Sequence, residues 1–164
     1  MKNQIIEYDD YAELILQNKY GYEVGRVLID LEDIELLSDI RWCLYSNRYA
    51  YNKRIGYLHR FLMNPPEGYV VDHINHNMLD NRKCNLRVCT QHQNTMNRGA
   101  RKDNQTGVKG VTKSGNNYLV RIVYNGQCIY LGTYNTIEEA SHVYQEKARE
   151  LFGEYNYEPS NEVH

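Results

Sequence analysis

The chain is poor in the features that mark membrane and secreted proteins. It has no apolar run of the roughly 18 residues that a transmembrane helix needs, and its start, MKNQIIEYDDYAELI, lacks the apolar stretch of a secretory signal. Its four cysteines form no C-x-x-C pair, so a zinc site of paired thiolate ligands is not supported. We therefore expect a cytosolic chain with reduced thiols and no membrane partner.

Phenylalanine and tryptophan are also scarce. The chain has 2 Phe and 1 Trp against 16 Tyr. Tyrosine presents an apolar ring and a polar tip, which suits half-exposed surfaces and thin sheets. With 41% hydrophobic residues over 164 positions, the composition still provides for one medium domain or two small ones.

The net charge is only −2, but its distribution is uneven. Residues 1–50 carry a net charge of −5, residues 51–113 carry +7, and residues 114–164 carry −4. A basic centre between acidic flanks is typical of a local phosphate-binding surface on a protein that stays soluble. The alternative is a chance excess of cations on a solvated face.

Turn signals and hydrophobic periodicity divide the chain. In the first part, strand-like and short helical stretches run up to a break at Asn-Pro-Pro-Glu-Gly, residues 64–68. Residues 69–98 then follow as strand, polar loop, strand and short helix. We expect one domain over residues 1–97 and a basic linker, without hydrophobic pattern, over residues 98–106.

A second compact unit is expected over residues 107–158, with a tail at 159–164. Three strand-like stretches are separated by turn signals, of which the Asn-Gly pair at 125–126 is typical of a tight hairpin. Thr136 and Glu139 fit a capping box at the start of a helix. The expected fold class is α+β, and this unit is a small three-stranded antiparallel sheet packed on one helix.

The chemistry-bearing side chains lie in the strand–loop–strand–helix stretch. Asp72 and His73 end a strand, and Asn94 lies on the helix that follows. If the strands pair and the helix folds back, these side chains converge. Asp72 and Asn94 offer oxygen ligands that suit Mg²⁺, while His73, on the opposite side of the strand, can serve as a general base. A plain hydrogen-bonded polar loop is the alternative.

The stretch LHRFLMNPPEGYVVDHINHNMLDNRKCNLRVCTQHQNTMNR, residues 58–98, resembles the HNH endonuclease family. It is most similar to the phage and intron-encoded homing type, whose third motif position is Asn. The resemblance implies a ββα-metal unit at about 69–98, attached to a β-rich N-terminal segment. It also implies that His73 is the general base, that Asn85 braces the loop, and that Asp72 and Asn94 hold one divalent ion, Mg²⁺ or Mn²⁺. The family loop often has Gly where this chain has His76.

The stretch YLVRIVYNGQCIYLGTYNTIEEASHVYQEKARELFGEY resembles the DNA-binding domain of plant ethylene-response factors (Apetala-two-like), which also occurs fused to phage homing endonucleases. In that family the three-stranded sheet lies in the major groove. The resemblance implies DNA contacts by Lys109, Arg121 and Tyr130. Positions where plant members usually carry arginine hold other residues here, namely Thr112, Val123 and Cys128.

The function predicted from these observations is hydrolysis of a phosphodiester bond in double-stranded DNA, with one nick per binding event. The location would be the cytosol of the host cell if a phage encodes the chain, and no obligate protein partner is evident. The alternative is a catalytically inactive DNA-binding regulator on the same scaffold. The candidate DNA contacts are Arg60, Arg87, Arg98, Arg101, Lys102, Lys109, Lys113, Arg121 and Tyr130.

Overall fold

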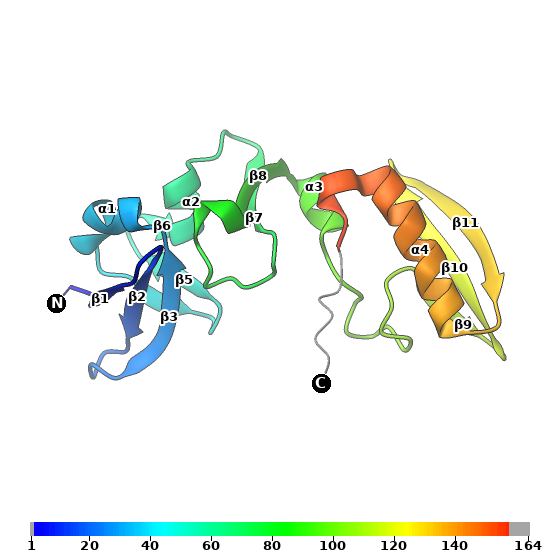
Figure 1. Cartoon of the computed structure of the whole chain (residues 1–164), viewed down its shortest axis with the longest axis horizontal. Helices are drawn as coiled ribbons and strands as arrows, with labels where there is room; N and C mark the ends of the chain where they lie inside the picture. The colour runs from blue at the N-terminus through cyan, green and yellow to red at the C-terminus, as the bar shows by residue number, and fades with distance from the viewer. Residues whose placement is uncertain (1, 158–164) are drawn as a thin grey trace. The chain divides into compact units, whose positions relative to one another are not determined.

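A computed structural model of the chain describes residues 2–157 (Figure 1). The chain divides into two compact units, Met1–Gln91 and His92–His164. Residue 158 and the expected tail lie outside the described residues. Among residues 2–157, no helix is both long and apolar enough to cross a membrane.

The first unit is rich in short strands. Its elements, in chain order, are β1 (Ile5–Glu7), β2 (Ala12–Gln17), β3 (Glu23–Ile29), the 3-10 turn η1 (Leu31–Asp33), α1 (Ile34–Ser38), β4 (Cys43–Tyr45), β5 (Tyr49–Asn52), β6 (Gly56–Tyr57), α2 (Leu58–Met63), β7 (Tyr69–His73), the 3-10 turn η2 (Lys83–Asn85) and β8 (Leu86–Thr90). They form three antiparallel sheets with the orders β1-β2-β3, β4-β5-β6 and β7-β8.

The core of the first unit lies against one face of the β1-β2-β3 sheet. Ala12, Leu14 and Leu16 alternate along β2 and are fully buried, as the period of a strand requires. Trp42 and Leu58 come from outside this sheet and complete the same apolar cluster. The acidic N-terminal segment is therefore a packed scaffold.

The N-terminal sheet also supports the loop that follows β7. The main-chain N–H of Leu28 in β3 donates to the carbonyl of Leu79 at 2.8 Å, and the N–H of Asn81 donates to the carbonyl of Leu28 at 2.8 Å. These hydrogen bonds form a parallel bridge between Leu28 and Asp80. The β3 strand thus fixes the middle of the loop between β7 and β8.

The second unit contains the expected three-stranded sheet and the helix that packs on it. It contains β9 (Val111–Ser114), β10 (Asn117–Tyr124), β11 (Gln127–Tyr134), α4 (Ile137–Phe152) and the 3-10 turn η3 (Gly153–Tyr155). The antiparallel order is β11-β10-β9. Asn125 and Gly126 have φ values of 49° and 78°, as a tight hairpin turn requires. The Thr136 hydroxyl accepts the main-chain N–H of Glu139 at 3.2 Å, so the expected helix cap is present.

The faces of the sheet are divided as the strand period predicts. Val120 and Ile122 are buried, and they pack with Tyr144 of α4 into the core of the second unit. Arg121 and Val123 are exposed on the opposite face. The α+β fold class is therefore confirmed for both units.

The boundary between the units falls at the start of α3 (Gln91–Met96), whereas the sequence placed it after residue 97. Met96 packs against the core of the second unit. Within the expected linker, the Asn104 side chain accepts the N–H of Thr106 at 2.8 Å and donates to the carbonyl of Val108 at 2.8 Å. Part of the linker is therefore folded onto the second unit.

Candidate active site

The Asp-His pair lies on an antiparallel hairpin. Strands β7 and β8 pair so that Asp72 is opposite Arg87 and His73 is opposite Leu86. Both functional side chains are buried, since Asp72 is 8% exposed and His73 is 3% exposed. Buried polar groups of this kind need partners, because removing them from water is otherwise costly.

The Asp72 carboxylate is held by the guanidinium of Arg87. Its Oδ2 accepts hydrogen bonds from Nε of Arg87 at 3.0 Å and from Nη2 at 2.7 Å. The two side chains are only 9% and 14% exposed, so salt screens this ion pair weakly. Arg87 was predicted to contact DNA, but in this structure its charge is directed at the predicted metal ligand.

Asn85 fastens the loop between the two strands. Its Oδ1 accepts the main-chain N–H of Asn75 at 2.9 Å, and its Nδ2 donates to the main-chain oxygen of Asp80 at 2.8 Å. The side chain is only 5% exposed. A buried amide that uses both its donor and its acceptor is a strong local constraint, and it has the geometry of a loop brace.

Asp80 and Arg82 provide a second brace. Nε and Nη2 of Arg82 each donate to the Asp80 carboxylate at 2.8 Å. Burial raises the pKa of Asp80, but the hydrogen bonds from Arg82 more than offset this and the pKa lies below its ordinary value. Neither Asp80 nor Arg82 was predicted to have a role of its own. His76 adopts a left-handed φ of 63°, so the turn at this position has the conformation that glycine favours.

The imidazole of His73 lies in an aromatic environment. Its ring centroid is 5.0 Å from that of His59, edge to face, and 6.4 Å from that of Tyr49. Burial lowers the pKa of His73, while the neighbouring Asn81 side chain and the negative charge of Asp72 oppose this. The net effect favours the neutral imidazole, which is the form that can accept a proton at neutral pH.

His59 also lies beside the site, and it was not among the residues predicted to bind metal or DNA. It is 8% exposed, and burial lowers its pKa to about 3, with the nearby His73 adding to the effect. A neutral His59 adds no positive charge beside His73. Its place directly before Arg60 at the edge of the motif was the only signal in the sequence.

Asn94 lies on α3 in the second unit, half-buried, whereas Asp72 lies in the first unit. Among residues 2–157, no group of three or more His, Cys, Asp or Glu side chains could hold a metal ion. The motif instead predicts a carboxylate and an amide oxygen, and such hard ligands suit an Mg²⁺ that keeps most of its waters. Asp72 supplies the carboxylate of this donor set, and the guanidinium of Arg87 lies against it in this structure.

The remaining predicted contacts in or near the motif are cationic and exposed. Arg60 lies on α2, where its Nη1 donates to the main-chain oxygen of Tyr69 at 3.3 Å. Arg98, Arg101 and Lys102 follow α3 and are exposed. Positive groups in such positions can bind phosphates without reading sequence.

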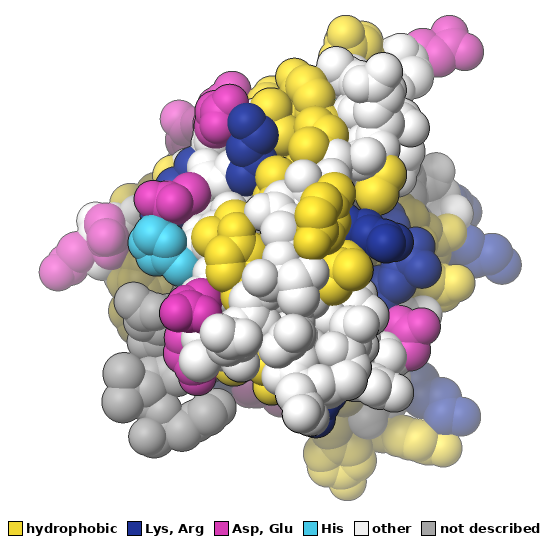
Figure 2. Space-filling view, turned by 90° about the vertical axis from the view of Figure 1, so that its right-hand side faces the viewer, with side chains coloured by type: hydrophobic (Ala, Val, Ile, Leu, Met, Phe, Trp, Pro, Cys, Tyr) yellow, Lys and Arg dark blue, Asp and Glu magenta, His cyan; other side chains and the backbone are white. Residues whose placement is uncertain are grey.

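The outer face of the sheet in the second unit presents Arg121 and Tyr130, which are exposed on β10 and β11. Lys113 is exposed on β9 but is opposite Tyr118 in the register, so it lies on the face that packs against α4. Tyr130 is 57% exposed and Val123 is 59% exposed. Figure 2 shows hydrophobic side chains gathered in the middle of the view, with Lys, Arg and acidic side chains interspersed around them. Lys109 is different, because its ammonium donates to main-chain oxygens of α3.

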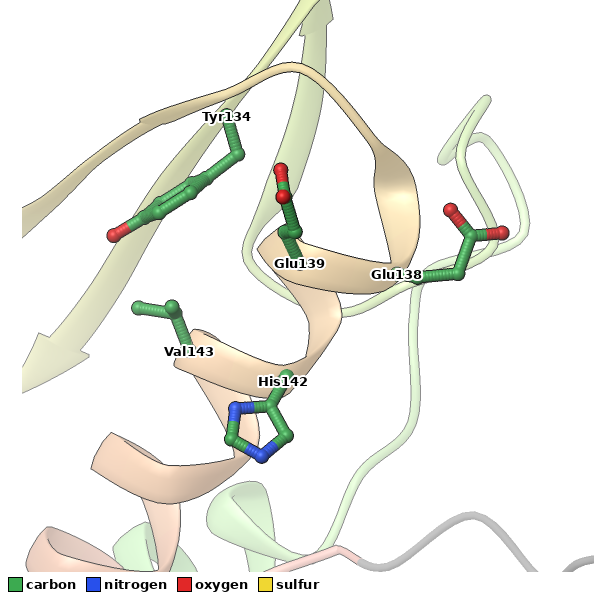
Figure 3. A pocket seen from close by; sticks show the side chains of 5 residues that line it. All are labelled: Tyr134, Glu138, Glu139, His142 and Val143. Atoms are coloured by element: carbon green, nitrogen blue, oxygen red, sulfur yellow. The ribbon is translucent and has the colours of Figure 1, made fainter.

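A shallow pocket of about 460 Å³ lies elsewhere on the second unit, beside the start of α4. It is lined by Tyr134, Glu138, Glu139, His142 and Val143 (Figure 3). The two carboxylates at its rim repel phosphate, so this pocket does not suit a nucleic-acid backbone.

The β7–β8 hairpin, its braced loop and the short helix α3 follow one another along the chain in the order strand, loop, strand, helix. The sequence profile of the HNH endonuclease family matches residues 63–96. The chain is 33% identical over 135 residues to a protein described as an uncharacterized HNH endonuclease of Acanthamoeba polyphaga mimivirus, covering 77% of this chain and 71% of that protein. The chain belongs to the HNH endonuclease family. No solved structure matches it.

Proposed function

We propose that the chain hydrolyses a phosphodiester bond in double-stranded DNA, with His73 as the general base. Membership of the HNH endonuclease family indicates nuclease activity on DNA. The observation that carries the finer proposal is the environment of His73, which is 3% exposed and whose pKa is lowered by burial. A neutral imidazole beside a carboxylate can take a proton from water at neutral pH.

Asp72 and Asn94 are the proposed ligands of one divalent ion. Such an ion supplies charge stabilisation for the scissile phosphate and for the oxygen that leaves. Within the chain, Arg87 orients the Asp72 carboxylate through two hydrogen bonds to a single oxygen. Asn85 keeps the loop after His73 in one conformation, so the base stays on the hairpin end.

The proposed step is attack of a water molecule on the phosphorus atom. A water molecule loses a proton to the His73 imidazole and its oxygen forms a bond to phosphorus. The bond between phosphorus and the sugar oxygen then breaks, and the leaving oxygen acquires a proton from solvent. A single catalytic unit of this kind cuts one strand per binding event, so we propose a nick as the first product.

The sheet of the second unit is the proposed element that holds the nuclease on DNA. Its likeness to the DNA-binding domain of ethylene-response factors comes from sequence motifs alone. The exposed face of Arg121, opposite the buried Val120 and Ile122, supports a role in the major groove. Because Thr112, Val123 and Cys128 stand where the plant domains that it resembles usually carry arginine, we propose contacts to phosphates more than base readout.

A plasmid assay tests the catalytic proposal. The wild-type chain should convert supercoiled DNA first to the nicked form with Mg²⁺ or Mn²⁺, and His73→Ala should reduce the rate by at least about 100-fold. His142→Ala is the matched control, since His142 is exposed on α4. Full activity of His73→Ala, or inactivity of the wild type on both plasmid and phage genomic DNA with either metal, would overturn the proposal.

A further inference from the structure

The outer face of the β4-β5-β6 sheet is built from tyrosine. In the register of this sheet, Tyr45 is opposite Tyr49, and Tyr51 is opposite Tyr57. Ala50, between Tyr49 and Tyr51, points the other way and is buried in the core at 2% exposed. The four rings therefore share the face that turns away from the core.

The rings of this tyrosine face, formed by Tyr45, Tyr49, Tyr51 and Tyr57, touch one another. The centroids of Tyr45 and Tyr51 are 5.2 Å apart, those of Tyr51 and Tyr57 are 5.3 Å apart, and those of Tyr49 and Tyr57 are 5.5 Å apart. Tyr45 is 49% exposed, and the other three are half-buried. The result is one continuous aromatic surface open to solvent at Tyr45.

The tyrosine face leads to the proposed general base. Tyr57 stacks on His59 with centroids 5.5 Å apart and an angle of 20° between the rings. The ring centroid of His59 in turn lies 5.0 Å from that of His73. An aromatic surface that begins in solvent therefore ends beside the side chain that would activate water, all within the first unit.

The charged residues of the segment that contains these rings are all positive. Residues 40–66 contain five cations, Arg41, Arg48, Lys53, Arg54 and Arg60, and no carboxylate, whereas the ten acids of residues 1–50 all precede position 40. Arg48, Lys53 and Arg54 are exposed in the two hairpin turns. Among residues 2–157, no carboxylate forms an ion pair with any of these three. Their charge is therefore available to a polyanion.

We propose that the tyrosine face binds unpaired nucleotides of the DNA strand that flanks the scissile phosphate, with Arg48, Lys53 and Arg54 on the neighbouring phosphates. Exposed aromatic rings bordered by cations are the combination that binds single strands, because every base has a face that stacks on a ring. A paired duplex hides those faces. The proposal rests on the proposed function only in taking DNA as the substrate, and it makes locally opened duplex the preferred form.

Binding without cleavage tests this proposal. Fluorescence anisotropy would compare three labelled oligonucleotides, namely a matched duplex, the same duplex with a short mismatched bubble, and the single strand, in EDTA with the His73→Ala chain. We expect the bubble to bind at least about tenfold more tightly than the matched duplex, since each stacked base contributes that order of affinity. Equal affinity for bubble and duplex would overturn the proposal.

Substitutions test separately the contributions of the tyrosine rings and of the cations to DNA binding. Tyr45→Leu should remove most of the preference for the bubble, while Tyr45→Phe retains it. Lys53→Gln should weaken binding to all three DNAs alike and reduce the salt slope by about one. Tyr22→Leu is the control, because Tyr22 is 72% exposed in the acidic segment. If Tyr45→Leu and Tyr22→Leu behave alike, the tyrosine face is not the binding surface, whether or not the wild-type chain cleaves plasmid.

Discussion

The ammonium of Lys109 donates a hydrogen bond to the main-chain oxygen of Met96 at 2.8 Å and another to that of Thr95 at 3.3 Å. These carbonyls close the last turn of α3, where a positive charge stabilises a helix. The contact lies within the second unit and helps to explain why α3 belongs to it. The prediction that Lys109 binds phosphate competes with this role, since the same donors serve the helix.

Lys109 should make the second unit more stable as the pH rises. Burial lowers the pKa of Lys109 from 10.5 to about 8, with Arg98 adding to the effect. Between these values the unfolded chain binds more protons than the folded chain, so the free energy of unfolding increases with pH. Denaturant titrations of the wild type and Lys109→Met between about pH 7.5 and about pH 9.5 measure the difference in slope. Lys113→Met is the exposed control, and identical slopes for wild type and Lys109→Met would contradict the expectation.

Gly110 should tolerate no side chain. Its φ is +74°, and an added Cβ would lie 2.1 Å from Cε2 of Tyr144 and 2.4 Å from the main-chain oxygen of Arg121. We expect Gly110→Ala to lower the free energy of unfolding by more than about 4 kcal/mol, because main chain cannot give way. Gly115 has a φ of +60° and open space around it, so Gly115→Ala should cost only about 1–2 kcal/mol. Similar losses in urea titrations of the two variants would argue against a tight fit at Gly110.

Local sequence patterns predicted most of the secondary structure. The features that were not predicted depend on contacts between residues far apart in the sequence. The Asn125-Gly126 turn and the Thr136 cap depend on neighbours in the chain, so their residue types alone predicted them. The bridge between Leu28 and the loop at Asp80 joins segments far apart in sequence and had no local signal. The partner of Arg87 was missed for the same reason, since Asp72 lies on the opposing strand and only the register sets them side by side.

His59 should make the first unit sensitive to acid. Burial lowers its pKa from 6.5 to about 3. Between these values the unfolded chain binds a proton that the folded chain does not, so stability is lost as the pH falls from about 6.5 towards about 3. The slope can reach about 1.4 kcal/mol per pH unit for one proton. Unfolding curves of His59→Phe should be flatter in this range than those of the wild type, whereas His142→Phe should follow the wild type. If the stability of His59→Phe falls with decreasing pH as steeply as that of the wild type, the expectation is wrong.

Asn85 should be needed for both stability and cleavage. Its substitution by Ala leaves the N–H of Asn75 and the carbonyl of Asp80 without their side-chain partner. Each lost partner costs about 1–3 kcal/mol when the remaining group is buried. We expect Asn85→Ala to unfold at a lower urea concentration and to nick plasmid about 10- to 100-fold more slowly. Asn77→Ala is the control in the same loop, because Asn77 is exposed. Wild-type nicking by folded Asn85→Ala would show that the brace is dispensable.

Arg87 should compensate the negative charge of Asp72 when the proposed metal ion is not bound. Both side chains are largely buried, at 14% and 9% exposed, so Arg87→Met leaves a carboxylate without its cation and should cost about 3–5 kcal/mol. A divalent ion that binds the folded chain at Asp72 offsets part of this loss in proportion to its concentration. Thermal unfolding in EDTA and in Mg²⁺ should therefore show a larger rise in Tm on adding Mg²⁺ for Arg87→Met than for the wild type. Arg54→Met controls for loss of an exposed cation. If Mg²⁺ raises the Tm of wild type and Arg87→Met equally, Arg87 and the ion do not share the Asp72 carboxylate.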